Sequence, residues 1–282
     1  MSLTDRRGVT LVELLIAMVV SAILGSLMLS ATATITSVLR GRVERVGAEV
    51  AARAIWGAIR FDWASLGGDS LAGPDLGSLA ATVVDYRADR GLVSVCRLVP
   101  DTVVVASGRL GQWVARAPVA GRDSLLLYAA GDSSAQIDAW VPIALMAGPF
   151  VGGCSSGQPG DMFVTQLDSA TIARRRLRSP AVARVVETMR ARLYGASALW
   201  QFGFEGISAG ASVQPVASNL AGPAGLVIVG WGCDGLPAPV ASLCGVDVRV
   251  RTTTKRDVGL GAGHGVAAVD SLSVAVRFEN RP

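Results

Sequence analysis

The chain has 282 residues, of which 51% are hydrophobic and 17% charged, with a formal net charge of +4. This length is enough for one large domain or two modest ones with a real core. So small a net charge does not by itself argue for a polyanionic partner, and the sparse aromatics are not interleaved with the arginines as in nucleic-acid-binding proteins.

The most apolar part of the chain lies near its start, between Val9 and Ile35. Residues 14–35 form a stretch of 22 residues without a charge. As a helix rising about 1.5 Å per residue, that stretch is long enough to cross a bilayer. Arg6 and Arg7 precede it, and positive charge on the short leading side favours a cytoplasmic N-terminus. The sequence therefore predicts a single membrane-spanning helix.

Two ordinary alternatives compete for this segment, a secretory signal peptide and a plain signal anchor. A signal peptide has an apolar region of roughly 7–15 residues, which this run exceeds, although residues 30–33 (Ser-Ala-Thr-Ala) form a weak cleavage site. Neither alternative explains Glu13, a carboxylate close to the start of the apolar stretch. An ionised group there is costly unless it is paired, so it marks a function by default.

The residues from Arg7 to Glu13, Arg-Gly-Val-Thr-Leu-Val-Glu, resemble the leader motif of type IV prepilins. The resemblance implies that a prepilin peptidase cuts between Gly8 and Val9 and that Val9 is then N-methylated. It also implies that Glu13, the fifth mature residue, pairs with the terminal amine of a neighbouring subunit during assembly. A buried ion pair relieves what either charge would cost alone. The chain departs from the family in starting with valine and in lacking a proline near Ser30.

The resemblance also implies a location, a set of partners and a structural role rather than an enzymatic one, with no cofactor. The chain would be an inner-membrane protein with an extracytoplasmic head, later built into an extracellular or periplasmic filament. Its partners would be other pilins or pseudopilins, the prepilin peptidase and the inner-membrane assembly platform. The expected organisation is a leader at 1–8, a transmembrane and filament-core helix at 9–35, its amphipathic continuation at 36–65 and a β-rich head at 66–282.

Beyond the apolar stretch the pattern becomes amphipathic. Apolar residues recur at three- and four-residue steps, with charged residues between them. This predicts one continuous helix that runs to about Trp63 and ends before Gly67 and Gly68. We expect its apolar stripe to pack on the head; the stripe comprises Leu39, Val43, Val46, Val50, Ala54 and Ile55.

The rest of the chain has the pattern of strands broken by Gly, Pro, Asp and Ser. Residues 246–251 and 272–278 alternate as half-buried strands do, and residues 125–128 and 226–229 are continuous apolar runs typical of interior strands. Residues 188–194 and 199–204 indicate a hairpin, with a helix over 181–192 as the alternative. The predicted fold class is therefore α+β, a long N-terminal helix packed on a large antiparallel β-rich head.

The size of the head bears on its place in a filament. Bulky heads would crowd one another in a closely repeating shaft, whereas a tip position leaves room above them. The order of features also resembles the larger minor pilins (the PilW-like group) and the J-type pseudopilins of type II secretion. This second resemblance rests on the hairpin that includes Tyr194 and Trp200 and on the closing Arg277-Phe-Glu-Asn280. It implies a minor pilin or pseudopilin of the tip or priming complex.

Four cysteines follow the apolar segment, Cys96, Cys154, Cys233 and Cys244. Beyond a membrane they would lie in an oxidising compartment, where disulfides are the default. Three pairings are open. We favour Cys233–Cys244, which closes a short loop, and then Cys96–Cys154 by elimination; reduced cysteines remain the alternative. No CxxC pair occurs and His264 is the single histidine, which disfavours zinc. The spacing of the loop aspartates (Asp132, Asp138, Asp161 and Asp234) matches no EF-hand, so we assign no metal site and leave calcium open.

Two G-x-S-x-G matches, around Ser155 and Ser208, raise the question of a serine hydrolase. A nucleophile elbow needs a strand before the serine and a helix after it. Neither match leads into a convincing helix, and the one available base, His264, lies in a glycine-rich turn. The glycines there do not form G-x-G-x-x-G, and no P-loop is present. The sequence therefore predicts no catalytic residues.

The densest basic run spans residues 174–178 and contains Arg174, Arg175, Arg176 and Arg178. The favoured interpretation is a solvated loop without a function of its own. The alternative is contact with DNA, an anionic surface polymer or an acidic partner, because arginine suits bidentate phosphate contacts. On that alternative, the head would be a binding module for DNA, a surface or a secreted substrate, carried on the same anchor.

Overall fold

The computed structural model describes residues 10–69, 73–108, 112–114, 116–129, 139–196, 199–254 and 269–278. The chain divides into two compact units. The first contains Met1–Glu49 and Thr253–Asp270, and the second, called the head below, contains Val50–Thr252 and Ser271–Pro282.

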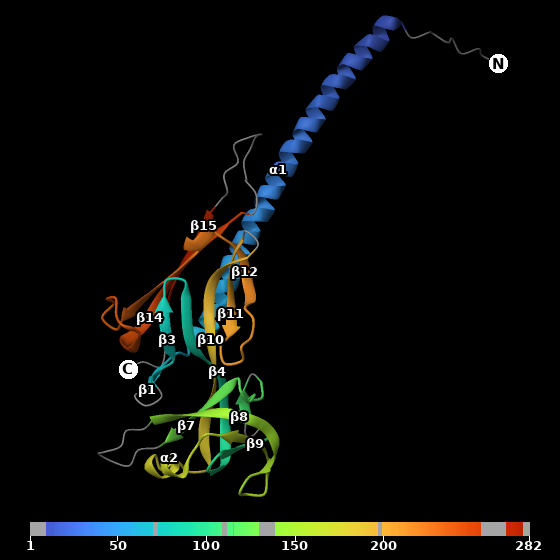
Figure 1. The fold of residues 1–282 in the computed structure, drawn as a ribbon. Helices are drawn as coiled ribbons and strands as arrows, with labels where there is room; N and C mark the ends of the chain where they lie inside the picture. Colours follow the sequence, from blue (N-terminus) through green and yellow to red (C-terminus); the bar gives the residue numbers. More distant parts are fainter. Residues whose placement is uncertain are drawn as a thin grey trace, which may run out of the picture. The chain divides into compact units, whose positions relative to one another are not determined.

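A single helix, α1 (Leu11–Trp63), contains the whole predicted helical region in 53 residues (Figure 1). It ends where the sequence predicted, just before Gly67. In its apolar part, hydroxyls hydrogen-bond to carbonyls one turn back; Thr32 Oγ1 donates to the Met28 oxygen at 2.8 Å, and Thr36 Oγ1 to the Thr32 oxygen at 2.9 Å. These polar groups are thus satisfied inside the helix, which suits an apolar surrounding.

The elements after α1 are mostly antiparallel strands, as the predicted α+β class requires. They are β1 (Gly68–Asp69), β2 (Gly73–Pro74), β3 (Leu76–Ala80), β4 (Val83–Val99), β5 (Thr102–Ala106), β6 (Gln112–Val114), β7 (Asp123–Ala129), β8 (Ala139–Gly153), β9 (Pro159–Thr165), α2 (Ser169–Arg174), β10 (Ala181–Ala196), β11 (Leu199–Gly206), β12 (Gln214–Leu220), η1 (Gly222–Ala224), β13 (Leu226–Gly232), η2 (Val240–Ser242), β14 (Leu243–Thr253) and β15 (Val269–Arg277).

Two long strands, β4 and β10, form the spine of the head. They pair antiparallel from Ala181 opposite Val95 to Arg192 opposite Val83. The alternative of a helix over 181–192 was wrong, because hydrogen bonds to β4, β7 and β11 flank this segment on both sides and outweigh its local helix propensity. The predicted hairpin at 188–204 is confirmed as β10–β11.

One end of the spine is part of a closed barrel. The strands β4, β5, β9, β8, β7 and β10 are hydrogen-bonded in that order, and the pairing of β10 with β4 closes the ring. We call this part of the head the barrel lobe. Its interior is filled by buried apolar side chains from every strand of the ring, among them Val95, Val105, Leu125, Ile143, Phe163 and Val185. Closure leaves the ring without free edges.

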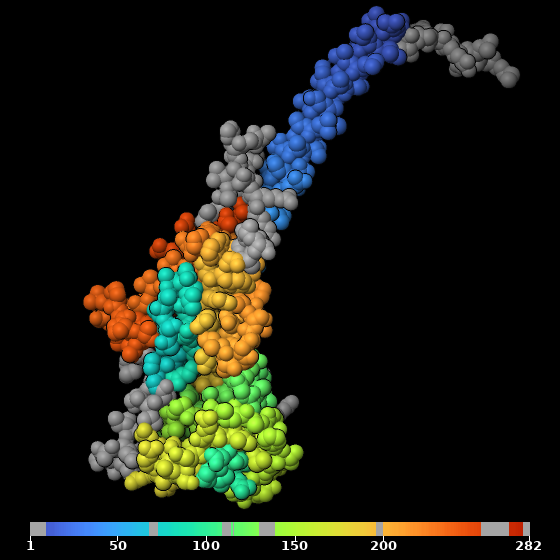
Figure 2. All heavy atoms as spheres, viewed as in Figure 1, coloured from blue at the N-terminus to red at the C-terminus, as the bar shows by residue number. Residues whose placement is uncertain are grey.

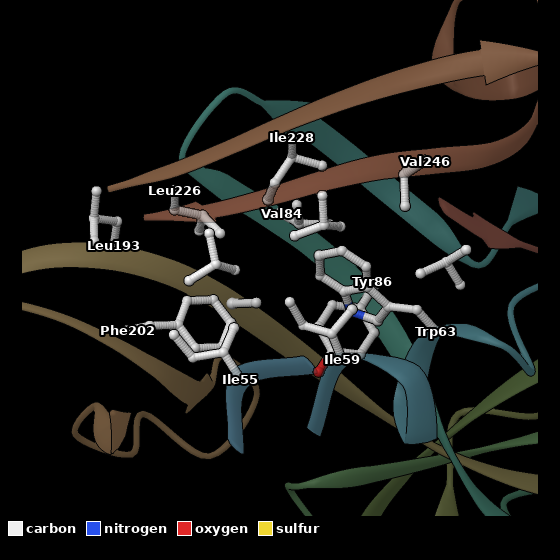
Figure 3. Close-up of a cluster of buried hydrophobic side chains, with 14 of the residues drawn as sticks. Ile55, Ile59, Trp63, Val84, Tyr86, Leu193, Phe202, Leu226, Ile228 and Val246 are labelled. Carbon is white, nitrogen blue, oxygen red and sulfur yellow. The ribbon is translucent and has the colours of Figure 1, made fainter. Parts of the chain in front are cut away.

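The other end of the spine surrounds the last turns of α1. We call this part, residues 50–63 with β3 and β11–β15, the helix lobe. Its core contains Ile55, Ile59 and Trp63 of the helix, packed among side chains of the surrounding strands (Figure 3). The amide of Ile228 on β13 donates to the carbonyl of Ala81 in the β3–β4 turn at 3.0 Å, which joins the two ends of the strand order.

The two lobes meet where the spine strands bend. Gly91 of β4 has φ of +118°, a conformation that favours glycine, and β10 carries a register shift between Val185 and Val186. The two hydrophobic cores are distinct on either side of this junction.

The structure corrects the face of the helix that packs on the head. Val43, Val46 and Val50 of the predicted stripe are 57–71% exposed. The buried face is instead formed by Ala52, Ile55, Ile59 and Trp63; of the predicted stripe only Ile55 belongs to it. The small Ala52 lets strands approach the helix closely, whereas the valines lie on a different face.

Candidate functional site

The first described turn of α1 is built around Thr10 and Glu13. The Glu13 amide donates to Thr10 Oγ1 at 3.3 Å, and the Leu14 amide donates to the Thr10 carbonyl at 3.1 Å. Thr10 therefore caps the helix, and Thr-x-x-Glu has the spacing of a capping box. Sequence reasoning missed this local role, although the signal stands in the sequence. Gly8 and Val9, the predicted cleavage and methylation site, lie outside the described residues.

Within the part of the chain that the structure describes, no other segment covers the apolar part of α1. An 18-residue window of this helix has a mean hydropathy of 2.4 and is 0% buried, so by length and composition the helix can cross a membrane. Large side chains such as Leu14, Val20 and Leu27 are 48–60% exposed. Figure 2 shows this part of the helix in blue, with all of its heavy atoms drawn as spheres. Such an apolar surface needs a lipid or protein neighbour.

Glu13 is the sole charged residue between Leu11 and Leu39. Its position in the first turn places a carboxylate where the unsatisfied amides of a helix N-terminus concentrate positive potential. The carboxylate and the helix N-terminus are thus complementary in charge.

Both cystine bridges lie in the head. The structure joins Cys96 to Cys154 and Cys233 to Cys244, the pairings favoured from the sequence. The first attaches the β8–β9 turn to β4 in the barrel lobe, and the second links the end of β13 to β14 in the helix lobe. Such bridges form in oxidising compartments, in agreement with an extracytoplasmic head.

A cluster of ion pairs occupies the junction between the lobes. Glu187 of β10 is 1% exposed, and its carboxylate accepts hydrogen bonds from Arg90 at 2.9 Å, Arg116 at 3.1 Å and Arg122 at 2.5 Å. Burial alone would raise the pKa of Glu187, but the hydrogen bonds from Arg122 and Arg90 outweigh burial and hold that pKa below its usual value.

The cluster extends from the barrel to the end of α1. Arg116 also binds the buried carboxylate of Asp123, while Arg90 lies 3.4 Å from Asp62 of α1. The Tyr86 hydroxyl donates to Asp62 at 2.7 Å, and burial raises the pKa of Tyr86 well above its usual value. The charges are matched and hydrogen-bonded, so the arrangement joins two lobes rather than presenting a reactive group.

The basic run at 174–178 lies on the last turn of α2 and in the loop that follows. Arg174, Arg175, Arg176 and Arg178 are exposed, whereas Leu177 between them is buried. Asp168 caps α2 by accepting from the Thr171 amide at 2.6 Å, and its bonds with Thr171 lower the pKa of Asp168. The run is thus an exposed turn at the surface of the barrel lobe.

Neither serine motif forms a nucleophile elbow. Ser155 lies in the β8–β9 turn and Ser208 in the turn after β11, and no helix follows either one. The Ser208 hydroxyl donates to the Arg122 carbonyl. His264, Asp132 and Asp138 lie outside the described residues. Within the described ranges, no group of three or more His, Cys, Asp or Glu side chains has the arrangement of a metal site.

Comparison with known proteins bears on the N-terminal segment. The family model described as the prokaryotic N-terminal methylation motif matches residues 3–29. The match contains Gly8, Val9 and Glu13 and supports a type IV pilin-like protein. No curated protein and no solved structure matches the chain.

Proposed function

We propose that this chain is a minor pilin or pseudopilin, processed between Gly8 and Val9, that acts in the tip or priming complex of a type IV pilus or type II secretion filament. The observation that carries the proposal is the apolar part of α1, which no other described segment covers and which overlaps the methylation motif at residues 3–29. A bilayer covers this surface before assembly, and the helices of neighbouring subunits cover it afterwards.

The exposed valines of α1 support the same role. Leu39, Val43, Val46 and Val50 follow one another at steps of four, three and four residues, and all are more than half exposed. This is the spacing of a helix-packing seam. On the proposed function, the predicted stripe contacts neighbouring helices rather than the head of its own chain.

The size of the head supports a position at the tip. In the described part of the head, the antiparallel sheet has 13 strands arranged in two lobes. Such bulk is best accommodated where no further subunit is stacked above it. A second function, recognition of DNA or another anion from the tip, is favoured by the exposure of all four arginines at 174–178. The test is DNA binding by the full chain, measured over a range of salt concentrations. Salt-dependent binding that is lost when those arginines are neutralised would identify this second function.

Substitutions at Thr10 and Glu13 separate capping from assembly. We expect Glu13→Ala to leave processing largely intact and to reduce incorporation into filaments about tenfold or more, because an unpaired amine is then left in the bundle. Glu13→Gln keeps a side chain that fits a capping box but removes the charge, so it should be as defective as Glu13→Ala. Thr10→Ala removes the cap and keeps the charge.

The measurement is the ratio of the chain in sheared filaments to the chain in membranes, in cells with its own assembly genes. Ser21→Ala removes a polar group from the same segment and serves as the control. Normal incorporation of Glu13→Gln, with a defect in Thr10→Ala, would show that Glu13 acts only in capping. Absence of the wild-type chain from filaments would reject the proposed function.

A further inference from the structure

The surface of the barrel lobe has an open cavity that the filament role does not use. It has a volume of about 610 Å³, within the range of small-molecule sites. It is lined from four segments: β4, the end of β5, the β8–β9 turn and the loop before β10. The side chains that bring polar groups to it are Ser94, Ser107, Ser155, Ser156, Gln158 and Ser179.

The polar lining is neutral and largely open to solvent. Four of the five lining serines, Ser107, Ser155, Ser156 and Ser179, are exposed. Among the described residues lining the cavity, none carries a charge. Serine hydroxyls and a glutamine amide both donate and accept hydrogen bonds. The lining side chains therefore suit a neutral ligand whose own polar groups both donate and accept hydrogen bonds.

The frame around the cavity is fixed before any ligand binds. The Cys96–Cys154 disulfide holds the β8–β9 turn against β4. Within that turn the Cys154 amide donates to the Gln158 carbonyl at 2.8 Å, and the Ser107 amide donates to the Pro159 carbonyl at 3.2 Å. A pre-formed frame lowers the entropy cost of binding.

The strands at the cavity have their edges occupied, which argues against an added peptide strand. Val95 of β4 pairs with Ala181 on one side and Val105 on the other, and Ala106 of β5 pairs with Gly160. A peptide that binds by strand addition needs a free edge. Pro159 and Pro180 instead offer small apolar faces beside the hydroxyls, a combination that suits the mixed C–H and O–H surface of a sugar ring.

From these observations we propose that the cavity binds a neutral saccharide of one or two rings. The site lies in the barrel lobe, across the junction from the last turns of α1, so it is presented away from the end of the helix. The inference does not depend on the filament role, because it rests on the cavity and its lining alone.

The test uses the full chain in a zwitterionic detergent, since glycoside detergents would compete. Glucose, galactose, mannose, N-acetylglucosamine, maltose, lactose and chitobiose are titrated with ligand-observed NMR as the readout. At least one should bind with a Kd below about 10 mM. Ser156→Trp, in an exposed turn, should abolish that binding by filling the cavity. Ser169→Trp, on exposed α2 outside the cavity, should leave it unchanged.

Single serine substitutions test whether the lining hydroxyls bind the sugar. Ser155→Ala and Ser179→Ala should each weaken binding about fivefold, the usual effect of one lost hydrogen bond. Failure of every sugar in the panel to bind, or equal binding by the wild type and Ser156→Trp, would overturn the proposal. Binding of inorganic phosphate at this cavity in place of sugars would overturn it as well.

Discussion

Replacing Glu187 by alanine is expected to lower the free energy of unfolding by about 3–5 kcal/mol. The carboxylate is buried and is hydrogen-bonded to three arginines, so its removal takes from the junction the carboxylate that they share, although Arg116 keeps Asp123 and Arg90 keeps Asp62. For a head of this size the loss corresponds to a fall in the unfolding temperature of about 10 °C. Thermal unfolding of the full chain in detergent measures it.

Asp247→Ala is the matched control, since it removes an exposed carboxylate from β14. Its effect should stay within about 0.5 kcal/mol. If Glu187→Ala and Asp247→Ala had equal effects, the junction would not depend on its buried charge.

The same carboxylate should make the head sensitive to acid. The pKa of Glu187 is lower in the folded protein than its ordinary value, so its ion pairs stabilise the fold above the unfolded pKa of about 4.3. This contribution is lost as the pH falls through the folded pKa. Glu187→Gln should therefore show a smaller loss of stability than the wild type when the pH is lowered from about 5 to about 3.

Removal of the Cys96–Cys154 disulfide is expected to cost about 4 kcal/mol, and removal of Cys233–Cys244 about 3 kcal/mol. The sequence separations are 58 and 11 residues, and the longer loop restricts the unfolded chain more. Each bridge is removed by a pair of Cys→Ala substitutions, so each double variant is the control for the other.

Chemical denaturation of the two variants and the wild type, at equal detergent concentration, measures the difference. A larger loss from the shorter loop would contradict the loop-entropy account. Reduction of the wild type should destabilise it more than either double variant, because both bridges are then lost.

Local patterns were sufficient to predict much of this fold. The end of α1 follows from Gly67 and Gly68, and the alternation at residues 246–251 predicted β14. The closed barrel was not predictable in this way, because Val95 and Ala181 pair across more than 80 residues without a local signal. The ion-pair cluster was missed for a related reason: Glu187 and Arg90 are ordinary surface residues by type, and only the long-range pairing of β4 and β10 buries them together.

The valine stripe of α1 was predicted to pack on the head, but the head buries another face of the helix. Periodicity identified a valine stripe on α1 but could not say what contacts it. The face buried by the head contains Ala52, Ile55, Ile59 and Trp63, and the predicted stripe included only Ile55 of these. Likewise Glu13 was recognised as an unusual charge, while its neighbour Thr10, which caps the same turn, was overlooked.

The measurement that tests the central claim most directly is the intact mass and N-terminal sequence of the membrane-extracted chain, made together with a prepilin peptidase. A mature chain that starts at N-methylated Val9 is the result that a type IV pilin-like role predicts. A chain that still starts at Met1 would indicate a simple membrane anchor, and one cut near Ala33 would indicate a secreted β protein; either would contradict the account.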